Sequence, residues 1–181
     1  MGGRVIVIMG PMWSGKSTEA IRLIRRYQAG KKSVLAINHS SDVRYGTKSI
    51  ITHDMDQVDC AQVASLDDVP IESIVSCDVV IIEEAQFFPG LQQFVRNAAD
   101  VHHKVVYVIG LDASAKRERL GEVLDVAMDA DDVRKLLALC RICGEDAPFT
   151  GSYREIPEDG VLVGGEDTYL PLCRKHWLEN H

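Results

Sequence analysis

The sequence of 181 residues lacks long apolar runs, an excess of positive charge and a large number of cysteines. No stretch approaches the roughly 20 apolar residues that a membrane-spanning helix needs, so we expect no association with a membrane. The first residues lead directly into a short apolar run, without the layout of a secretory signal. These absences predict a protein of the cytoplasm.

Positive charge is in the minority. Lys and Arg together number 20 against 27 Asp and Glu, which gives a net charge of -7. A broad positive field supplies most of the affinity of proteins for a nucleic-acid backbone. Because this chain lacks one, we expect no nucleic-acid partner, although a local basic pocket is still compatible with the composition.

The pattern of apolar runs predicts the fold. Continuously apolar, β-branched runs are typical of strands buried on both faces, and they alternate here with stretches of helical period. The expected strands are Arg4–Met9, Ser33–Asn38, Asp78–Ile82, Lys104–Gly110 and Arg134–Leu139. The expected helices are Lys16–Gln28, ended by Gly30, and Pro89–Asp100, while His39–Cys60 is expected to be a loop. This alternation predicts an α/β fold with a mostly parallel sheet flanked by helices.

A glycine-rich loop follows the first expected strand. Gly10–Ser17 matches G-x-x-x-x-G-K-[ST], in which backbone N–H groups surround phosphates at the start of a helix. Lys16 would reach the β- and γ-phosphates of a nucleoside triphosphate, and Ser17 would ligate Mg²⁺. With this motif, the predicted fold is P-loop NTPase-like, although the motif by itself leaves ATPase, GTPase and kinase open.

Two carboxylates end the third expected strand. In phosphate-loop proteins, an acidic side chain at this place holds Mg²⁺, usually through water, which is the role expected of Glu83. The neighbouring Glu84 could accept a proton from an attacking hydroxyl. Because successive side chains of a strand alternate, the two carboxylates are expected to point in different directions. The alternative is a solvated turn at the entry to a helix.

The C-terminal part has a different composition. Residues 141–172 hold five of the 14 Gly and three of the six Pro, too little apolar material for an independent core. Pairs of possible ligands flank this stretch: Cys140-x-x-Cys143 and Cys173-x-x-His176. Four such ligands suit a tetrahedral, structural zinc, which would stabilise a segment with a small core. The alternatives are unlinked thiols with a surface histidine, or a zinc ribbon that binds nucleic acid, which the net charge disfavours.

Over nearly its whole length the sequence resembles the type II thymidine kinases. The resemblance rests on the motifs GPMWSGKST (10–18), DVRY (42–45), THD (52–54), EEAQFF (83–88), GLD (110–112), GG-x-x-x-Y (164–169) and the CxxC…CxxH set. It implies an α/β kinase domain over 1–139, and a small zinc-ribbon domain over 140–181 carrying a lasso loop that closes over the substrate. The implied reaction transfers the γ-phosphoryl group of ATP to the 5′-hydroxyl of thymidine, with deoxyuridine as a second acceptor.

The resemblance also implies roles for individual residues. Glu84 would be the general base, Arg44 would neutralise charge on the transferred group, and Asp42 would lie near the metal and phosphates. The residues implied to bind ATP are Gly10, Pro11, Met12, Ser14, Gly15, Lys16, Ser17, Thr18 and Asp42. Those implied to bind thymidine are Met12, Phe87, Leu111, Ser114, Leu120, Thr150, Leu162, Val163, Gly164, Gly165 and Tyr169. Family members are usually tetramers, with a dimer as the alternative here, and are inhibited by dTTP.

The chain departs from the family pattern at three positions. Glu83 stands where the family usually has Asp, and Ala115 and Leu120 stand where it usually has aromatic residues. These differences leave a second hypothesis: a nucleotide-binding regulatory domain that is catalytically silent or has an altered specificity.

Overall fold

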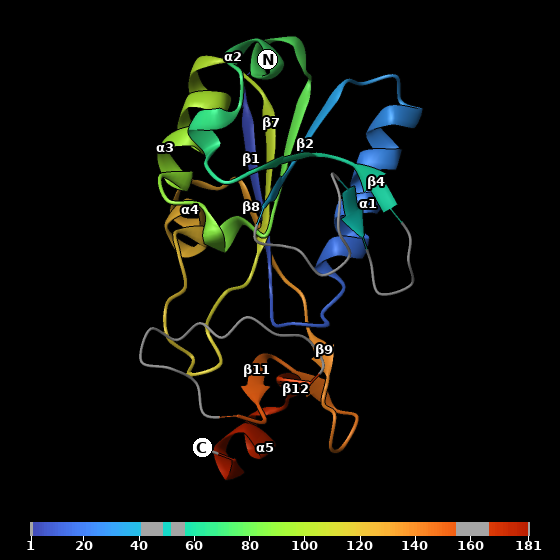
Figure 1. Cartoon of the computed structure of the whole chain (residues 1–181), viewed down its shortest axis with the longest axis vertical. Helices are drawn as coiled ribbons and strands as arrows, with labels where there is room; N and C mark the ends of the chain where they lie inside the picture. The colour runs from blue at the N-terminus through green and yellow to red at the C-terminus, as the bar shows by residue number, and fades with distance from the viewer. Residues whose placement is uncertain (1, 41–48, 52–56, 155–166, 181) are drawn as a thin grey trace.

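A six-stranded parallel sheet forms the centre of the protein (Figure 1). The computed structural model describes residues 2–40, 49–51, 57–154 and 167–180. The strand order is β5-β2-β6-β7-β1-β8, and every neighbouring pair is parallel. The strands are β1 (Arg4–Met9), β2 (Val34–His39), β5 (Ala61–Val63), β6 (Val79–Glu83), β7 (Val105–Gly110) and β8 (Asp132–Lys135). The predicted α/β class with a mostly parallel sheet is therefore confirmed.

Helices cover both faces of this sheet, as Figure 1 shows. Helix α1 lies on one face, and α2, α3 and α4 lie on the other. The helices are α1 (Lys16–Ala29), α2 (Ile71–Ser76), α3 (Leu91–Arg96), α4 (Val123–Asp129) and α5 (Arg174–Glu179). Among the residues with described positions, no helix is both long enough and apolar enough to cross a membrane.

Alternation along β1 divides the core into two layers. Ile6 and Ile8 pack with the buried face of α1, whereas Val5 and Val7 pack with apolar residues of α2, α3 and α4. Full burial of one such side chain contributes about 1.5–3 kcal/mol. The apolar face of each helix is thereby covered, which explains why strands β1, β6 and β7 are apolar at nearly every position.

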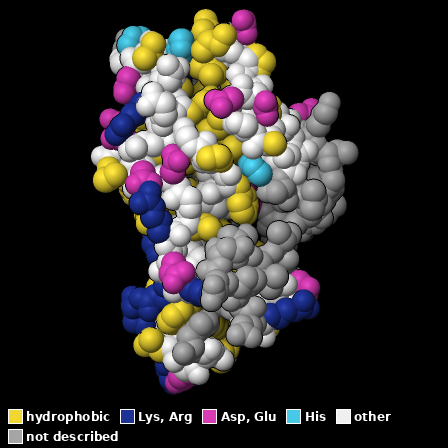
Figure 2. All heavy atoms as spheres, turned by 60° about the vertical axis from the view of Figure 1, so that its left-hand side comes forward, with side chains coloured by type: hydrophobic (Ala, Val, Ile, Leu, Met, Phe, Trp, Pro, Cys, Tyr) yellow, Lys and Arg dark blue, Asp and Glu magenta, His cyan; other side chains and the backbone are white. Residues whose placement is uncertain are grey.

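A smaller layer lies beyond the carboxyl ends of the strands, at the lower end of Figure 1. It contains two antiparallel pairs, β9 (Ala138–Leu139) with β10 (Asp146–Ala147), and β11 (Phe149–Ser152) with β12 (Tyr169–Leu172). Its apolar cluster is small and includes two tryptophans, Trp13 and Trp177, packed against buried residues of these strands. On the face shown in Figure 2, more Lys and Arg side chains lie in the lower half of the molecule than in the upper half.

The expected loop from His39 to Cys60 is wrong where the structure describes it. Strands β3 (Ser49–Ile51) and β4 (Gln57–Asp59) pair in antiparallel fashion. Ile50 is buried in the apolar cluster that includes the buried face of α1, and Val58 packs against this cluster. Each strand has only three residues, too few for a period to stand out in the sequence.

Two further expected boundaries are wrong. The helix expected from Pro89 begins at Leu91, because Gly90 adopts a left-handed conformation (φ 75°) before it, and it continues as a π-helical turn over Asn97–Val101. The run Arg134–Leu139 is divided between β8 and β9, which belong to different sheets. The apolar residues Leu136–Leu139 follow β8 directly, so the sequence gives no sign that a strand of another sheet begins among them. The short elements β5, α2 and α4 were also not predicted from the sequence.

Gly121 and Gly90 provide a matched test of packing around the loop after β7. Both have positive φ (59° and 75°), but a Cβ at position 121 would collide with the carbonyl oxygen of Gln86, whereas position 90 faces open space. We expect Gly90→Ala to lower the free energy of unfolding by roughly 1–2 kcal/mol, the cost of a left-handed residue. Gly121→Ala should cost clearly more in denaturant titrations, and equal losses would contradict this packing.

Candidate active site at the carboxyl edge of the sheet

The phosphate loop connects β1 to α1. Gly15 adopts a left-handed conformation (φ 82°) at the start of the helix. Lys16 Nζ donates to the carbonyl oxygen of Pro11 at 2.7 Å, and Ser14 Oγ donates to the same oxygen at 2.8 Å. The lysine ammonium therefore reaches back over its own loop. A Cβ at Gly10 would collide with the carbonyl oxygen of Leu136, so only glycine allows this close approach.

Ser17 and Glu83 lie in direct contact. Ser17 Oγ donates to Glu83 Oε1 at 2.5 Å, although 66 residues separate the two in sequence. The Glu83 side chain is buried, and its extra methylene relative to Asp does not keep it from Ser17. A hydroxyl and a carboxylate are hard oxygen donors of the kind that Mg²⁺ prefers.

Glu84 is held in an unusual conformation. Its backbone is left-handed (φ 51°, ψ 38°), and its side chain is half-buried. Glu84 Oε2 accepts a hydrogen bond of 2.5 Å from Gln86 Nε2. Strained non-glycine residues of this kind concentrate at functional sites. The two carboxylates at the end of β6 thus have different partners, Ser17 for Glu83 and Gln86 for Glu84.

Gln86 is a residue of the site that the sequence did not predict. It is buried, and its Oε1 accepts from the backbone N–H of Leu111 at 3.0 Å. The residue lies within the EEAQFF run, but nothing in the sequence indicates which groups its amide contacts. The structure therefore links Leu111, which was expected to contact the substrate, with the expected base Glu84.

Other residues expected to bind the substrate lie around the phosphate loop. The backbone N–H of Met12 donates to Thr150 Oγ1 at 3.1 Å, which joins the loop to β11. Tyr169 is buried against Ala115, with Met12 and Trp13 partly buried against the pair. The backbone carbonyl of Ala115 also accepts from the indole N–H of Trp177 at 3.1 Å. These contacts join the phosphate loop, the loop after β7 and the C-terminal layer.

Ser114, Phe87 and Leu120 have local surroundings of different kinds. Ser114 is buried, and its hydroxyl accepts from the backbone N–H groups of Lys116 and Glu118, so it organises a turn. The Phe87 ring lies 5.6 Å from the ring of His39, measured between centroids, and Leu120 is half-buried. Six expected site residues lie outside the described residues: Asp42, Arg44, Leu162, Val163, Gly164 and Gly165.

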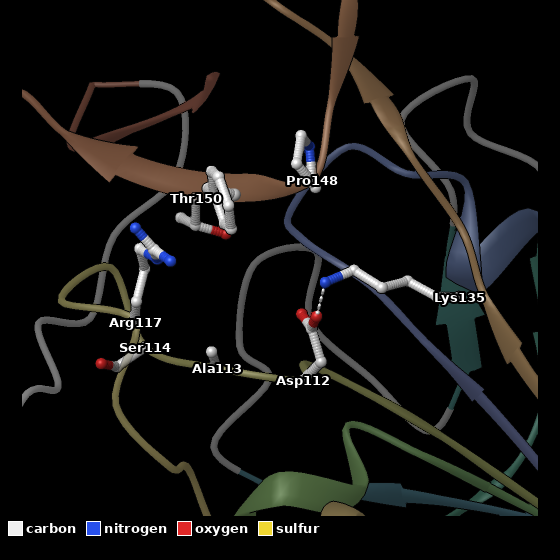
Figure 3. A pocket seen from close by; sticks show the side chains of 8 residues that line it. Asp112, Ala113, Ser114, Arg117, Lys135, Pro148 and Thr150 are labelled. Atoms are coloured by element: carbon white, nitrogen blue, oxygen red, sulfur yellow. Dashed lines mark ion pairs between the residues drawn. The ribbon is translucent and has the colours of Figure 1, made fainter. Parts of the chain in front are cut away.

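A cavity of about 130 Å³ lies beside these residues (Figure 3). Its walls include Ser114 and Thr150, and Figure 3 shows Lys135 pointing toward Asp112 at its edge. Lys135 Nζ and Asp112 Oδ2 form an ion pair of 2.5 Å. The remaining lining residues are Ala113, Arg117, Pro148 and Phe149.

Arg117 stacks on aromatic rings. Its guanidinium lies 4.4 Å from the ring centroid of Phe149 and 4.8 Å from that of Trp177. A cation over an aromatic face contributes about 0.5–1 kcal/mol where it is exposed. The structure thus places Arg117 against the C-terminal layer.

Trp13 connects the phosphate loop to the C-terminal layer. It packs with the cluster around Ala138, Cys140 and Leu172, and also with the pair Ala115 and Tyr169. Its backbone is left-handed (φ 61°). The sequence alone assigns no role to Trp13, because its partners come from distant segments.

The four expected zinc ligands lie together. The ligand atoms of Cys140, Cys143, Cys173 and His176 are all within 4.8 Å of one another, the one such cluster in the described part of the chain. The distances are 3.8 Å between Sγ of Cys143 and Cys173, and 3.5 Å and 3.2 Å from His176 Nδ1 to Sγ of Cys140 and Cys173. Tetrahedral zinc, with Zn–S about 2.3 Å and Zn–N about 2.0 Å, requires ligand separations of roughly 3.5–3.8 Å. The cluster therefore fits zinc.

The surroundings of Cys140 also suit a metal ligand. Burial raises the pKa of its thiol, but backbone N–H groups of Cys173, Cys143 and Ile142 and the side chain of His176 outweigh burial and lower the pKa to about 6. A lowered pKa favours the thiolate, which is the form that binds metals.

Comparison with known proteins agrees with this geometry. A model of the family described as "Thymidine kinase" matches residues 3–177. The chain belongs to the thymidine kinase family. It is 41% identical to "Thymidine kinase a" of Arabidopsis thaliana over 99% of this chain and 76% of that protein. It is 37% identical to the thymidine kinase of Vaccinia virus (strain Western Reserve) over 99% of both chains. The thymidine kinase of Oryza sativa subsp. japonica is 40% identical over 98% of this chain and 67% of that protein.

For this thymidine kinase family member, we predict one zinc per chain, bound by the four-ligand cluster. Cys143→Ser should lower both the zinc content, measured by elemental analysis, and the melting temperature by several degrees, because zinc binding contributes directly to folding. Cys60→Ser, which removes a thiol outside the cluster, is the control. Zinc-free wild-type protein, or full zinc content in the Cys143 variant, would contradict the assignment.

Proposed function

We propose that this protein transfers the γ-phosphoryl group of ATP to the 5′-hydroxyl of thymidine, and to deoxyuridine as a second acceptor. The observation that carries the proposal is the Ser17–Glu83 contact of 2.5 Å, with the strained Glu84 next in sequence. This contact brings a phosphate loop and a pair of carboxylates to one edge of the sheet. Membership in the thymidine kinase family supports the choice of acceptor.

In the proposed reaction, Glu84 removes the proton of the 5′-hydroxyl as its oxygen attacks the γ-phosphorus. A new P–O bond forms to the nucleoside, and the bond from the γ-phosphorus to the β–γ bridging oxygen breaks, leaving ADP. Lys16 stabilises negative charge on the β- and γ-phosphates, and Arg44 does so on the transferred group. The ATP site comprises the loop from Gly10 to Thr18 with Asp42.

Ser17 and Glu83 would hold Mg²⁺, Glu83 through water. When bound, Mg²⁺ neutralises phosphate charge. The direct hydrogen bond between the two side chains supports this assignment, because it places a hydroxyl oxygen and a carboxylate oxygen side by side.

We further propose that 1–139 and 140–181 act as a kinase domain and a zinc-binding domain with a substrate-closing lasso. The hydrogen bond between Met12 and Thr150 supports contact between them at the acceptor site. The thymidine site would be formed by Met12, Phe87, Leu111, Ser114, Leu120, Thr150 and Tyr169, with Leu162, Val163, Gly164 and Gly165 of the lasso. Exclusion of water by such a loop would protect the phosphoryl group from hydrolysis.

We propose dTTP as a feedback inhibitor, because it combines the thymidine of the acceptor site with a triphosphate suited to the phosphate loop. A homotetramer or homodimer in the cytoplasm completes the proposal. Support for association comes from the edge strand β8 and the segment after it, where Val133, Leu137 and Leu139 are all exposed.

Replacement of Glu84, the proposed general base, tests the reaction. Wild-type protein with ATP, Mg²⁺ and thymidine should yield thymidine 5′-phosphate and ADP. Glu84→Gln should reduce kcat by about 100-fold or more, since general-base catalysis contributes about 10²–10⁴-fold. Glu72→Gln, which removes an exposed carboxylate of α2, should have wild-type kcat. Normal turnover by the Glu84 variant would contradict the assignment of Glu84 as the general base. Tight binding of nucleoside by the wild type without formation of product would favour the alternative, a catalytically silent regulatory domain.

A thermal-shift series tests the specificity. Thymidine and dTTP should raise the melting temperature more than deoxycytidine or deoxyguanosine, because a ligand bound only by the native state stabilises it by about 2.7 kcal/mol at 100 times Kd. A shift with deoxyguanosine and none with thymidine would contradict the proposed acceptor.

A further inference from the structure

Gln86 joins two sides of the candidate acceptor site. Its Nε2 donates to Glu84 Oε2 at 2.5 Å, and its Oε1 accepts from the backbone N–H of Leu111 at 3.0 Å. We infer that Gln86 is a positioning residue that fixes the carboxylate of Glu84 relative to the loop after β7. The inference rests on the proposed phosphoryl transfer, in which Glu84 receives the proton.

The Gln86 side chain has little freedom to move. Only 4% of its surface is exposed. A Cβ at Gly110 would come within 2.6 Å of Gln86 Oε1, and one at Gly121 would collide with the Gln86 backbone. Glycine at both positions therefore makes room for this residue. A buried amide bonded at both ends is costly to displace, because a group that loses its partner remains desolvated.

The orientation of the amide follows from its partners. The backbone N–H of Leu111 can only donate, so it requires the amide oxygen. The ionised carboxylate of Glu84 can only accept, so it requires the amide nitrogen. One orientation of the amide satisfies both partners. It fixes the position of one carboxylate oxygen of Glu84 and thereby restricts rotation of that carboxylate.

The same bridge sets the distance between the base and the substrate. Leu111 directly follows β7, and Glu84 directly follows β6, so the two belong to neighbouring strand ends. Without the bridge, the left-handed backbone of Glu84 would still place its Cα, but the carboxylate would lose its link to the loop after β7. A displacement of a reacting group by about 1 Å can lower the rate about 100-fold.

The first test is Gln86→Met, which keeps an unbranched side chain of similar length and removes both hydrogen bonds. We expect kcat for thymidine to fall about 10- to 100-fold, as misplacement of a reacting group predicts, with a much smaller change in the KM for ATP. Gln92→Met is the matched control. The Gln92 amide donates to the carbonyl oxygen of Asp125 at 3.1 Å and to Asp129 at 3.0 Å, between α3 and α4, and its loss should leave kcat near wild type.

The second test is Gln86→Glu, which has the same shape and can still accept from Leu111. It replaces the amide N–H group that donates to Glu84 with a carboxyl oxygen, so the bridge to Glu84 is lost while the side-chain volume and the bond to Leu111 remain. We expect kcat for thymidine to fall about 10- to 100-fold, as in Gln86→Met, with a much smaller change in the KM for ATP.

Both tests require that the variant protein is folded, which is checked by thermal melting and by thymidine binding. If Gln86→Met does not fold, the isosteric Gln86→Glu decides. Wild-type kcat in Gln86→Met or in Gln86→Glu would overturn the positioning role. Absence of nucleoside phosphorylation by the wild type would instead reject the proposed function.

Discussion

Parallel pairing of β6, β7 and β1 is the constraint on which the candidate site depends. Parallel strands end at the same edge of a sheet, and ligands of open α/β sheets bind beyond that edge. The register aligns Ile82 with Val108, and Ile8 with Ile109, so the three strands end at nearly the same level. The phosphate loop, the carboxylate pair and the loop after β7 therefore meet there. The Ser17–Glu83 and Gln86–Leu111 hydrogen bonds are direct consequences of this alignment.

The C-terminal layer depends on contacts that it cannot provide itself. Its apolar cluster includes Trp13 of the phosphate loop, and Trp177 hydrogen-bonds to the backbone of Ala115. The cluster of three cysteines and His176 brings together two segments about 30 residues apart. A metal bound there would stabilise the surface against which Trp13 packs. Zinc in this protein would then have a structural role, because it would stabilise the layer that supports the phosphate loop.

Backbone strain in the described residues is concentrated around the site. Trp13, Glu84 and Arg117 are three of the five non-glycine residues with positive φ. Each is held by distinct contacts: the two apolar clusters for Trp13, Gln86 for Glu84, and the stacked rings for Arg117. Such conformations persist only where surrounding packing determines them. The surrounding fold therefore stabilises local conformations that the sequence would not adopt alone.

The sequence by itself determined the elements whose information is local. The apolar runs of β1, β6 and β7, the helix ended by Gly30 and the phosphate-loop motif each depend on neighbouring residues. The four possible zinc ligands were likewise visible as two close pairs. Tertiary structure decided whatever depends on partners distant in sequence. The β3–β4 pair was missed because Ile50 gains its burial from α1, and the division of Arg134–Leu139 was missed because hydrophobicity does not distinguish one sheet from another. The partners of Gln86 and Trp13 were hidden for the same physical reason: a hydrogen bond or an apolar contact forms between groups that the folded chain brings together, and residue type alone does not specify which groups those are.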